Sequence, residues 1–305
     1  MTSYLTSRVL QAIITIIGIS IVVFALSRLS GDAAALLIPP DASERDRLAL
    51  REQLGLDKPI IVQYALFLKG ALSFDFGNSF RFGKPALDVY MERFPATLQL
   101  AFVASLISAG VGVLIGVYSA VKSGGLTDRA ANLVALMGQA IPSFAISILM
   151  IVILAVEFRL LPTSGMGDWT SFIMPAIALS WYSLASLTRM TRSSMHDVLD
   201  TEYVRLARLK GLPERTVIWK HAFRNAMLPI LTLFSLQLVF FISGSVIVES
   251  IFAWPGVGQL SIQAIQARDY PLVQAIVFLS SVLLVALNLG VDVLYGFIDP
   301  RIRLS

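Results

Sequence analysis

Hydrophobic positions along the chain are gathered into long stretches that contain no charged side chain. Six of these stretches have between 19 and 28 residues each. They are Val9–Ser27, Phe94–Val121, Ala130–Val156, Trp169–Thr188, Asn225–Val248 and Tyr270–Val291. A helix needs about 20 mainly apolar residues to cross the hydrocarbon core of a bilayer. The pattern therefore predicts an all-α membrane protein with six transmembrane helices.

A seventh uncharged stretch, Ser250–Ala267, has a different character. It contains Gln259, Gln263 and Gln266 as well as a Trp254-Pro255-Gly256 turn. Such groups are costly against lipid, so we expect a folded external loop here. The first of the six long stretches exceeds the usual length of a signal-peptide core, and we expect it to remain as a transmembrane helix.

Lysine and arginine are distributed unevenly between the connecting segments. With the N-terminus inside, the inner segments hold 13 basic residues, eight of them between Arg189 and Arg224. The short outer loops hold only Arg159 and Arg268, and the long segment 28–93 holds nine basic and nine acidic residues. Basic residues in short loops favour the cytoplasmic side. We therefore expect cytoplasmic N and C termini, and the net charge of +4 indicates membrane topology rather than a nucleic-acid partner.

The composition excludes several kinds of chemistry. The chain of 305 residues has no cysteine, and its two histidines, His196 and His221, lie outside any zinc-peptidase pattern. No Gly-rich sequence of the kind that cradles nucleotide phosphates occurs, so we expect no catalytic residue, no metal site and no bound cofactor in this chain. The absence of charges in the spans also argues against an ion-coupled secondary transporter, and the absence of a nucleophile with a base argues against an intramembrane enzyme.

The predicted cytoplasmic segment 189–224 has the pattern of two short helices around a sharp break. Thr201 and Glu202 suit the start of the first helix, and Gly211 suits a left-handed C-terminal residue. Pro213 and Glu214 suit the first turn of the second. The pattern alone is compatible with an anchor at the membrane surface and with a docking element for a soluble partner.

This segment carries a recognisable signature. Residues 202–212 (EYVRLARLKGL) and 221–229 (HAFRNAMLP) resemble the EAA loop of the dipeptide, oligopeptide and nickel permeases of ABC importers. The resemblance covers almost the whole chain. It continues in LGLDKP at 54–59, RFPATL at 93–98, VESIFAWPGVG at 248–258 and DPRIR at 299–303.

The resemblance implies a type I ABC importer permease fold in a bacterial plasma (inner) membrane. Implied partners are a homologous second permease subunit, two cytoplasmic ATPase subunits that bind ATP and magnesium, and an external substrate-binding protein. This chain is similar to the permease with the large first external loop. The EAA loop of such permeases forms a coupling helix seated on an ATPase. Carried over to this sequence, the coupling positions are Glu202, Tyr203, Arg205, Ala207, Arg208 and Gly211.

The residue pattern predicts a division of the chain, and the resemblance implies a class of solute. We expect a first segment with one helix (1–30), an external lobe (31–93) and a five-helix core (94–305) that contains the coupling loop 189–224. Within the lobe we expect a polar helix over Ser43–Leu54 and an apolar-rich helix from about Ile60 to Ala71. The expected solutes are di- or oligopeptides. Nickel or glutathione remain alternatives, because the external binding protein usually sets selectivity in such systems.

Polar and small residues inside the spans are candidates for the transport route. Five polar residues are candidates for the translocation pathway, with interhelical hydrogen bonding as the competing interpretation: Gln139, Gln237, Ser243, Ser245 and Asn288. Glu249 and Trp254 are candidates for an external gate or a contact with the lobe. We expect kinks at Pro142 and Pro175, helix starts at Pro95, Pro229 and Pro271, and close helix packing at Gly110, Gly112 and Gly116.

Overall fold

The computed structural model describes residues 2–29, 43–45, 48, 52, 57–243 and 245–298. These residues form helices and connecting loops, with a single isolated bridge between Asn78 and Pro85. Most of the predicted helix Ser43–Leu54 lies outside the described residues, as do Leu54–Leu56 and the terminal segment 299–303. The predicted apolar-rich helix is present as α4 (Ile60–Leu72).

Five helical segments are long and apolar enough to cross a membrane, and a bent pair of helices brings the number to six. The prediction of an all-α protein with six spans is confirmed. The helices of the five unbroken segments are α1 (Thr2–Leu29), α5 (Ala86–Ile107) with α6 (Val113–Val121), α9 (Ile173–Leu199), α12 (Arg224–Ser243) and α15 (Tyr270–Ile298). A π-helical segment, Ser108–Gly112, joins α5 to α6 without a break.

The remaining span is broken. Helix α7 (Leu126–Ala140) and helix α8 (Ser143–Met150), with its π-helical extension Ile151–Glu157, meet at an angle of 107°. Ile141, which precedes Pro142, is extended at φ −94° and ψ 117°. A residue before proline is pushed out of the helical region, so the predicted kink at Pro142 is confirmed as a full break.

Two of the other prolines do not lie at helix starts, where the sequence predicted them. Pro95 lies inside α5 and Pro229 lies inside α12, so the prediction that they begin helices is wrong. The physical reason is that both helices continue beyond the uncharged stretch into polar sequence. Pro175 lies in the first turn of α9, where a missing N–H costs little, so the kink predicted there is wrong. Pro271 is the second residue of α15, so the predicted helix start is confirmed.

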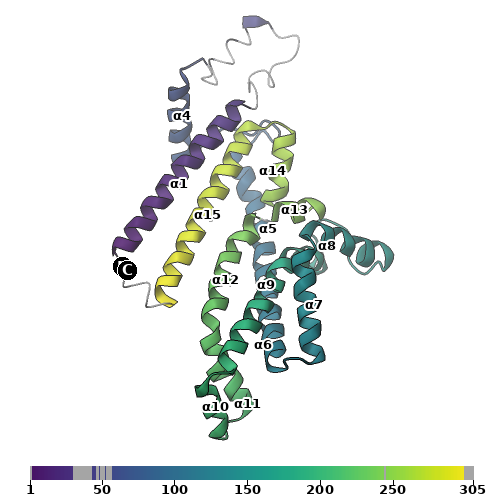
Figure 1. Ribbon diagram of the computed structural model, residues 1–305. Helices are drawn as coiled ribbons and strands as arrows, with labels where there is room; N and C mark the ends of the chain where they lie inside the picture. The colour runs from purple at the N-terminus through teal and green to yellow at the C-terminus, as the bar shows by residue number, and fades with distance from the viewer. Residues whose placement is uncertain are drawn as a thin grey trace. The chain divides into compact units, whose positions relative to one another are not determined.

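The chain forms two compact units. Unit 1 comprises residues 1–95 and 256–289, and unit 2 comprises 96–255 and 290–305. In unit 1, α4 packs against the C-terminal half of α1 through aromatic rings (Figure 1). The Phe24 ring centroid lies 5.5 Å from that of Tyr64 and 5.9 Å from that of Phe67, which in turn lies 6.3 Å from that of Phe278 on α15. Unit 1 also contains the helix α14 (Val257–Gln266), so the segment expected as a loop is largely helical.

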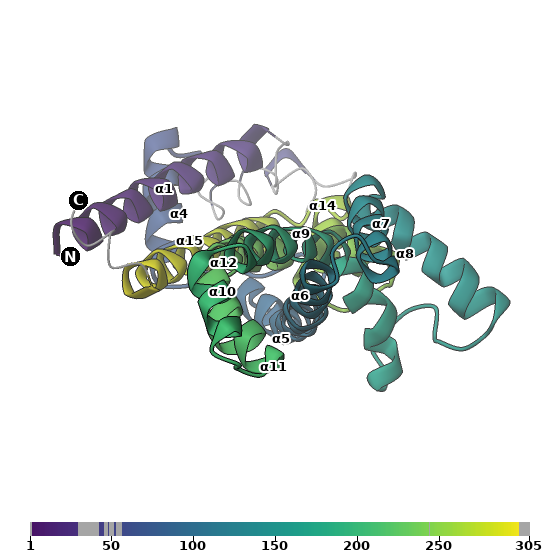
Figure 2. The same cartoon turned by 60° about the horizontal axis from the view of Figure 1, so that its bottom comes forward.

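Helix α9 is the centre of unit 2, where it packs against α6, α7, α8 and α12 (Figures 1 and 2). Glycines allow the closest of these approaches. A Cβ atom placed on Gly116 would lie 2.6 Å from Thr191 Cβ, and one on Gly112 would lie 2.9 Å from the Leu184 carbonyl oxygen. Close packing at Gly112 and Gly116 is therefore confirmed. Gly110 faces open space, so the expectation of close packing there is wrong.

The connecting segments of unit 2 gather at two opposite ends. At one end, the turn between α6 and α7 is bonded to the C-terminal part of α9 through Asp128 and Arg192. At the other end, the Gly165 N–H donates to the Phe252 carbonyl oxygen at 2.8 Å. The first group contains segments predicted to be cytoplasmic and the second contains segments predicted to be external. The alternation within unit 2 therefore agrees with the basic-residue pattern.

Candidate functional site

The predicted coupling segment forms the short helix α10 (Glu202–Leu209), which follows directly after α9. Thr201 is its N-cap residue, and Glu202 places an acid in the first turn, where it complements the helix dipole. Gly211 has φ +73° and its N–H donates to the Arg208 carbonyl oxygen at 2.9 Å. Helices often end at a residue in the left-handed conformation, which glycine adopts most readily. The predicted helix end is confirmed.

The sequence pattern predicted a second short helix in this segment, but the structure has no separate helix over the described residues 214–243. It begins at α11 (Glu214–Thr216), continues through the π-helical segment Val217–Phe223, and runs into α12 without interruption. The helical span therefore extends from Glu214 to Ser243. The sequence did not predict this continuous helix because charged and apolar residues are mixed between positions 214 and 224.

One face of α10 packs against the rest of unit 2. Val204 and Ala207 form a small buried cluster with Val217, against which Val198 and Leu199 at the end of α9 also pack. Only 7% of the Ala207 surface is exposed. The small side chain of Ala207 therefore permits close approach of α10 to the π-helical segment of its own chain.

Polar side chains fix α10 to its neighbours. The Arg208 guanidinium donates two hydrogen bonds to the Glu214 carboxylate, at 2.8 and 3.3 Å. Asn225 Nδ2 donates to Tyr203 Oη at 2.8 Å. These contacts join both ends of α10 to the start of the next span, so the helix and the span form one element. Within α10, Arg205 also donates to Glu202 at 3.0 Å, with both side chains exposed.

The outer face of α10 is partly apolar. Leu206 is 52% exposed and Leu209 is 83% exposed. The two leucines are three residues apart, so they share one exposed face of α10. The sequence reasoning missed both leucines because it concentrated on charged and small positions. The signal was present in the spacing of Leu206 and Leu209, which places them on one helix face.

An ion pair between the buried Asp128 and the partly exposed Arg192 was also missed. Asp128 is 4% exposed, and Arg192 donates to both of its carboxylate oxygens, from Nε at 2.6 Å and from Nη2 at 3.0 Å. The same carboxylate accepts bonds from Ser119 Oγ, the Gly124 N–H and Asn132 Nδ2. A bidentate arginine contact fixes orientation as well as distance. The cluster therefore fixes the α6–α7 turn to α9 at Arg192, ten residues before the start of α10.

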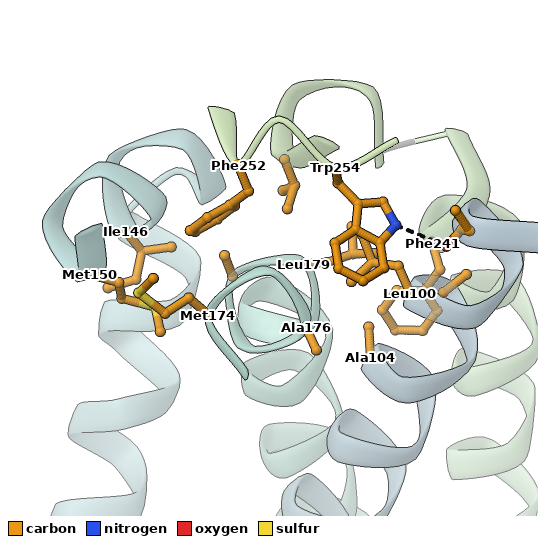
Figure 3. Packing of buried hydrophobic residues seen from close by; sticks show 14 of the residues in the cluster. Leu100, Ala104, Ile146, Met150, Met174, Ala176, Leu179, Phe241, Phe252 and Trp254 are labelled. Carbon is orange, nitrogen blue, oxygen red and sulfur yellow. Dashed lines mark hydrogen bonds between the residues drawn. The ribbon is translucent and has the colours of Figure 1, made fainter. Parts of the chain in front are cut away.

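At the opposite end of unit 2, two of the recognised motifs meet (Figure 3). Trp254 is fully buried, and its Nε1 donates to the Ala96 carbonyl oxygen at 2.9 Å. Thr97 Oγ1 donates to the fully buried carboxylate of Glu249 at 2.8 Å. Glu249 belongs to helix α13 (Ser245–Ile251), and Ala253, between the two buried side chains, has φ +47°. The motif at 248–258 is thus held against the motif at 93–98.

The predicted pathway residues fall into different environments. Gln139 accepts a hydrogen bond from Arg189 at 2.8 Å. Gln237 is 6% exposed, and within the described part of the chain neither atom of its amide has a hydrogen-bond partner. Ser243 and Ser245 donate to backbone carbonyl groups of their own helical turn. Asn288 is exposed on α15, in unit 1.

Two family models together match most of the sequence. The model described as "Binding-protein-dependent transport system inner membrane component" matches residues 112–304, and its N-terminal counterpart matches residues 1–101. The chain belongs to this permease family. The sequence-based recognition of an ABC importer permease is confirmed, and with it the interpretation as a multi-pass membrane protein.

Named relatives agree with this assignment. The permease is 38% identical to the "Oligopeptide transport system permease protein AppB" of Bacillus subtilis (strain 168), over 99% of this chain and 100% of the relative. It is also 38% identical to the "Glutathione transport system permease protein GsiC" of Escherichia coli (strain K12), over 99% of both chains. Both relatives are therefore similar to this permease over its whole length.

Solved structures show the same fold. An inward-facing form of the MetNI methionine ABC transporter matches with a TM-score of 0.56 at 15% identity, over 69% of this chain and 96% of that chain. An amino acid ABC transporter crystallised with histidines matches with a TM-score of 0.54 at 18% identity, over 68% of this chain and 92% of that chain. The likeness at these identities concerns the fold, and it confirms the predicted class of permease fold.

Proposed function

We propose that this permease forms one half of the translocation pore of an ATP-driven importer for short peptides. It pairs with a related second permease, receives solute from an external binding protein, and is driven by two cytoplasmic ATPases. Both of its termini are cytoplasmic, and the membrane is a bacterial plasma membrane. The family assignment over the whole chain supports this proposal. The observation that carries the coupling role is the helix α10, with its exposed Leu206 and Leu209.

In this proposal, α10 is the element through which an ATPase moves the permease. Leu206 and Leu209 insert into an apolar surface of the ATPase, and Glu202 with Arg205 contacts polar groups around it. The contacts of α10 with the start of the next span hold it rigidly within the permease, and they come from Tyr203, Ala207, Arg208 and Gly211. A helix fixed at both ends moves with its support, so a displacement of α10 is passed to α9 and α12.

The Asp128–Arg192 pair gives the movement a route to the broken span. Because it joins α9 to the start of α7, a shift of α9 also displaces α7, which ends at the Ile141–Pro142 break. A break between two helices lets one part rotate relative to the other. We therefore assign the break as the hinge at which the pore rearranges.

Gln139 and Gln237 are the proposed solute contacts of the pathway. A primary amide donates and accepts hydrogen bonds, and so matches the N–H and C=O groups of a peptide backbone. An unpaired buried amide costs about 1–3 kcal/mol, which favours an arrangement in which Gln237 acquires a partner. Ser243, Ser245 and Asn288 contribute less in this proposal, because both serines already bond within their helices and Asn288 lies in unit 1.

Glu249 and Trp254 act in this proposal as anchors of the external gate rather than as its moving surface. Both side chains are fully buried, so they do not meet a partner directly. They hold α13 against α5, and the external lobe (31–93) meets the binding protein. The five-helix core (94–305) then carries the pore and the coupling loop.

Peptides are the favoured solute, with glutathione as the second candidate. Oligopeptide and glutathione permeases are equally similar to this chain at 38% identity. Glutathione is itself a tripeptide-like molecule, so both candidates present amide groups to a pathway lined by amide side chains. Nothing observed favours nickel over these two.

A pull-down with transport measurements tests the proposal. We expect the tagged chain, purified in mild detergent, to carry a second six-span permease, ATPases and a solute-loaded binding protein. The reconstituted complex should accumulate labelled tri- to pentapeptides in an ATP-dependent manner. Recovery of the chain alone, under conditions that preserve a known importer, would contradict the proposed assembly. Uptake of glutathione but not of the other peptides would select the second candidate.

A further inference from the structure

Unit 1 contains a groove that the transport function does not use. It is a cavity of about 260 Å³ whose walls come from α1, α14 and α15. The side chains that line it are Val23, Leu26, Ile265, Arg268, Tyr270, Val273 and Val277. Arg268 carries the only charge among these described residues, and the others are apolar apart from the Tyr270 hydroxyl. A cavity with apolar walls disfavours water.

The groove lies where two spans reach the membrane surface. Leu26 is at the C-terminal end of the span in α1, and Tyr270 begins α15. Val277 is seven residues further along α15, which corresponds to about 10 Å at 1.5 Å per residue. The groove therefore extends from the level of the lipid headgroups into the upper part of the acyl chains, and Tyr270 has the position of an interfacial aromatic residue.

Part of the groove wall is buried and part is exposed: Val23 and Tyr270 are 4% and 8% exposed, whereas Val277 is 39% exposed. Only 17% of the most apolar part of the α1 span is buried, and 28% of that of the α15 span. Leu26 is 57% exposed and Ile265 is 61% exposed. Further along α1, Ile16 packs against the hydrophobic cluster that includes Phe278 and Leu279. The exposed side chains of the wall give the groove a lateral opening toward lipid.

The positive charge that lines the groove belongs to Arg268. No ion pair of Arg268 occurs within the described part of the chain. The adjacent carboxylate of Asp269 is fully buried and turned inward, where it accepts hydrogen bonds from Ser79 Oγ and from the Arg81 N–H at 3.1 Å. Arg268 has the left-handed conformation, at φ +51°. Its side chain lines the groove, whereas the Asp269 side chain bonds to Ser79. Guanidinium groups bind phosphate in a bidentate manner.

From these observations we infer that the groove binds one phospholipid molecule, with the lipid phosphate on Arg268 and an acyl chain along Val273 and Val277. The charge complementarity and the position at the membrane surface select this occupant. A phosphate anion alone would leave the apolar walls uncovered, and a bare hydrocarbon chain would leave the arginine unpaired. The site is independent of the proposed solute and of the ATPase contact.

Native mass spectrometry of the purified importer tests this site at a limiting concentration of defined phosphatidylglycerol and phosphatidylethanolamine. We expect the wild-type chain to retain one phospholipid after annular lipids are removed. Arg268→Ala should lower this occupancy at least about tenfold, the effect of losing a charged hydrogen-bonded contact. Val277→Trp should lower it by filling the groove.

Two variants serve as matched controls. Arg159→Ala removes an exposed arginine that is also left-handed, at φ +53°, and Val152→Trp enlarges a side chain that is 52% exposed on another span. Both should retain lipid as the wild type does. Unchanged occupancy in Arg268→Ala and Val277→Trp would overturn the inference. So would cross-linking of a Val277→Cys chain to the second permease by a bifunctional thiol–amine reagent, since a protein helix would then fill the groove. The chain has no native cysteine to interfere.

Discussion

At the scale of single residues, the packing of unit 2 depends on the absence of side chains at a few positions on α6 and α7. Three glycines face α9 at a distance that leaves no room for a Cβ atom: Gly112 at the end of the π-helical segment, Gly116 of α6 and Gly138 of α7. The Gly112 carbonyl oxygen also accepts a hydrogen bond from Thr188 Oγ1 at 3.1 Å. Small residues of this kind let helix backbones approach closely, which is a main source of helix association in membranes.

Gly116→Ala should destabilise the protein. The new Cβ would lie 2.6 Å from Thr191 Cβ and 2.7 Å from the Thr188 carbonyl oxygen, so α6 and α9 would have to separate. Overpacking of this kind costs about 1–3 kcal/mol. The unfolding midpoint in detergent measures the effect, and Gly110→Ala is the control because nothing lies within 4 Å of its added Cβ. Equal midpoints for the two variants would contradict the packing account.

Residue patterns revealed part of this arrangement before the structure did. Gly110, Gly112 and Gly116 were predicted together because they are small residues gathered in one span, and only the last two pack closely; Gly138 is isolated in its sequence. The Asp128–Arg192 pair was not predictable, because 64 residues separate its members and a single acid beside Lys122 and Arg129 has the appearance of a surface charge. Local spacing identifies helix faces, but it does not say which helices meet.

At the scale of elements, the coupling segment depends on a left-handed turn at Gly211. A β-branched residue at φ +73° costs about 1–3 kcal/mol, whereas asparagine adopts this conformation more readily. Gly211→Val should therefore lower ATP-dependent peptide uptake at least about tenfold, while Gly211→Asn retains most of it. Equal amounts of both variants in the membrane provide the control. Full uptake by Gly211→Val would remove the coupling role of this turn.

The joint between α7 and α9 gives a second prediction at this scale. Asp128→Asn leaves the Arg192 charge without its carboxylate and should cost about 3 kcal/mol, the lower part of the range for breaking a buried pair, since Arg192 is partly exposed. Arg192→Lys keeps the charge but loses the bidentate contact, so it should lower the free energy of unfolding by less than Asp128→Asn does. A double-mutant cycle of unfolding free energies measures the coupling, and strictly additive effects would show that the two residues do not act together.

The elements themselves were largely predictable. Uncharged stretches located all six spans, and the Gly-Leu-Pro sequence at 211–213 located the end of α10. The helix ends were predicted less well, because α5 and α12 continue past the apolar stretch and carry Pro95 and Pro229 inside them. Hydropathy reports where lipid surrounds a helix, and the helix continues where packing or capping supports it.

At the scale of the whole molecule, we propose that the energy source of the permease lies in another protein. Predicted cytoplasmic segments share one end of unit 2, and α10 with its exposed leucines is at that end. The predicted external segments share the other end, where buried Glu249 and Trp254 hold the chain together. This separation suits a permease that contacts an ATPase at one membrane surface and receives solute at the other.

Site-directed cross-linking tests the central claim most directly. The chain has no cysteine, so Leu209→Cys on α10 introduces a single thiol at a position that is 83% exposed. Leu160→Cys, which is 69% exposed in a loop predicted to be external, is the matched control. We expect a bifunctional thiol–amine reagent to join the Leu209→Cys chain to an ATPase subunit and the Leu160→Cys chain to none. No cross-link from Leu209→Cys in an intact, ATP-hydrolysing complex would contradict the account.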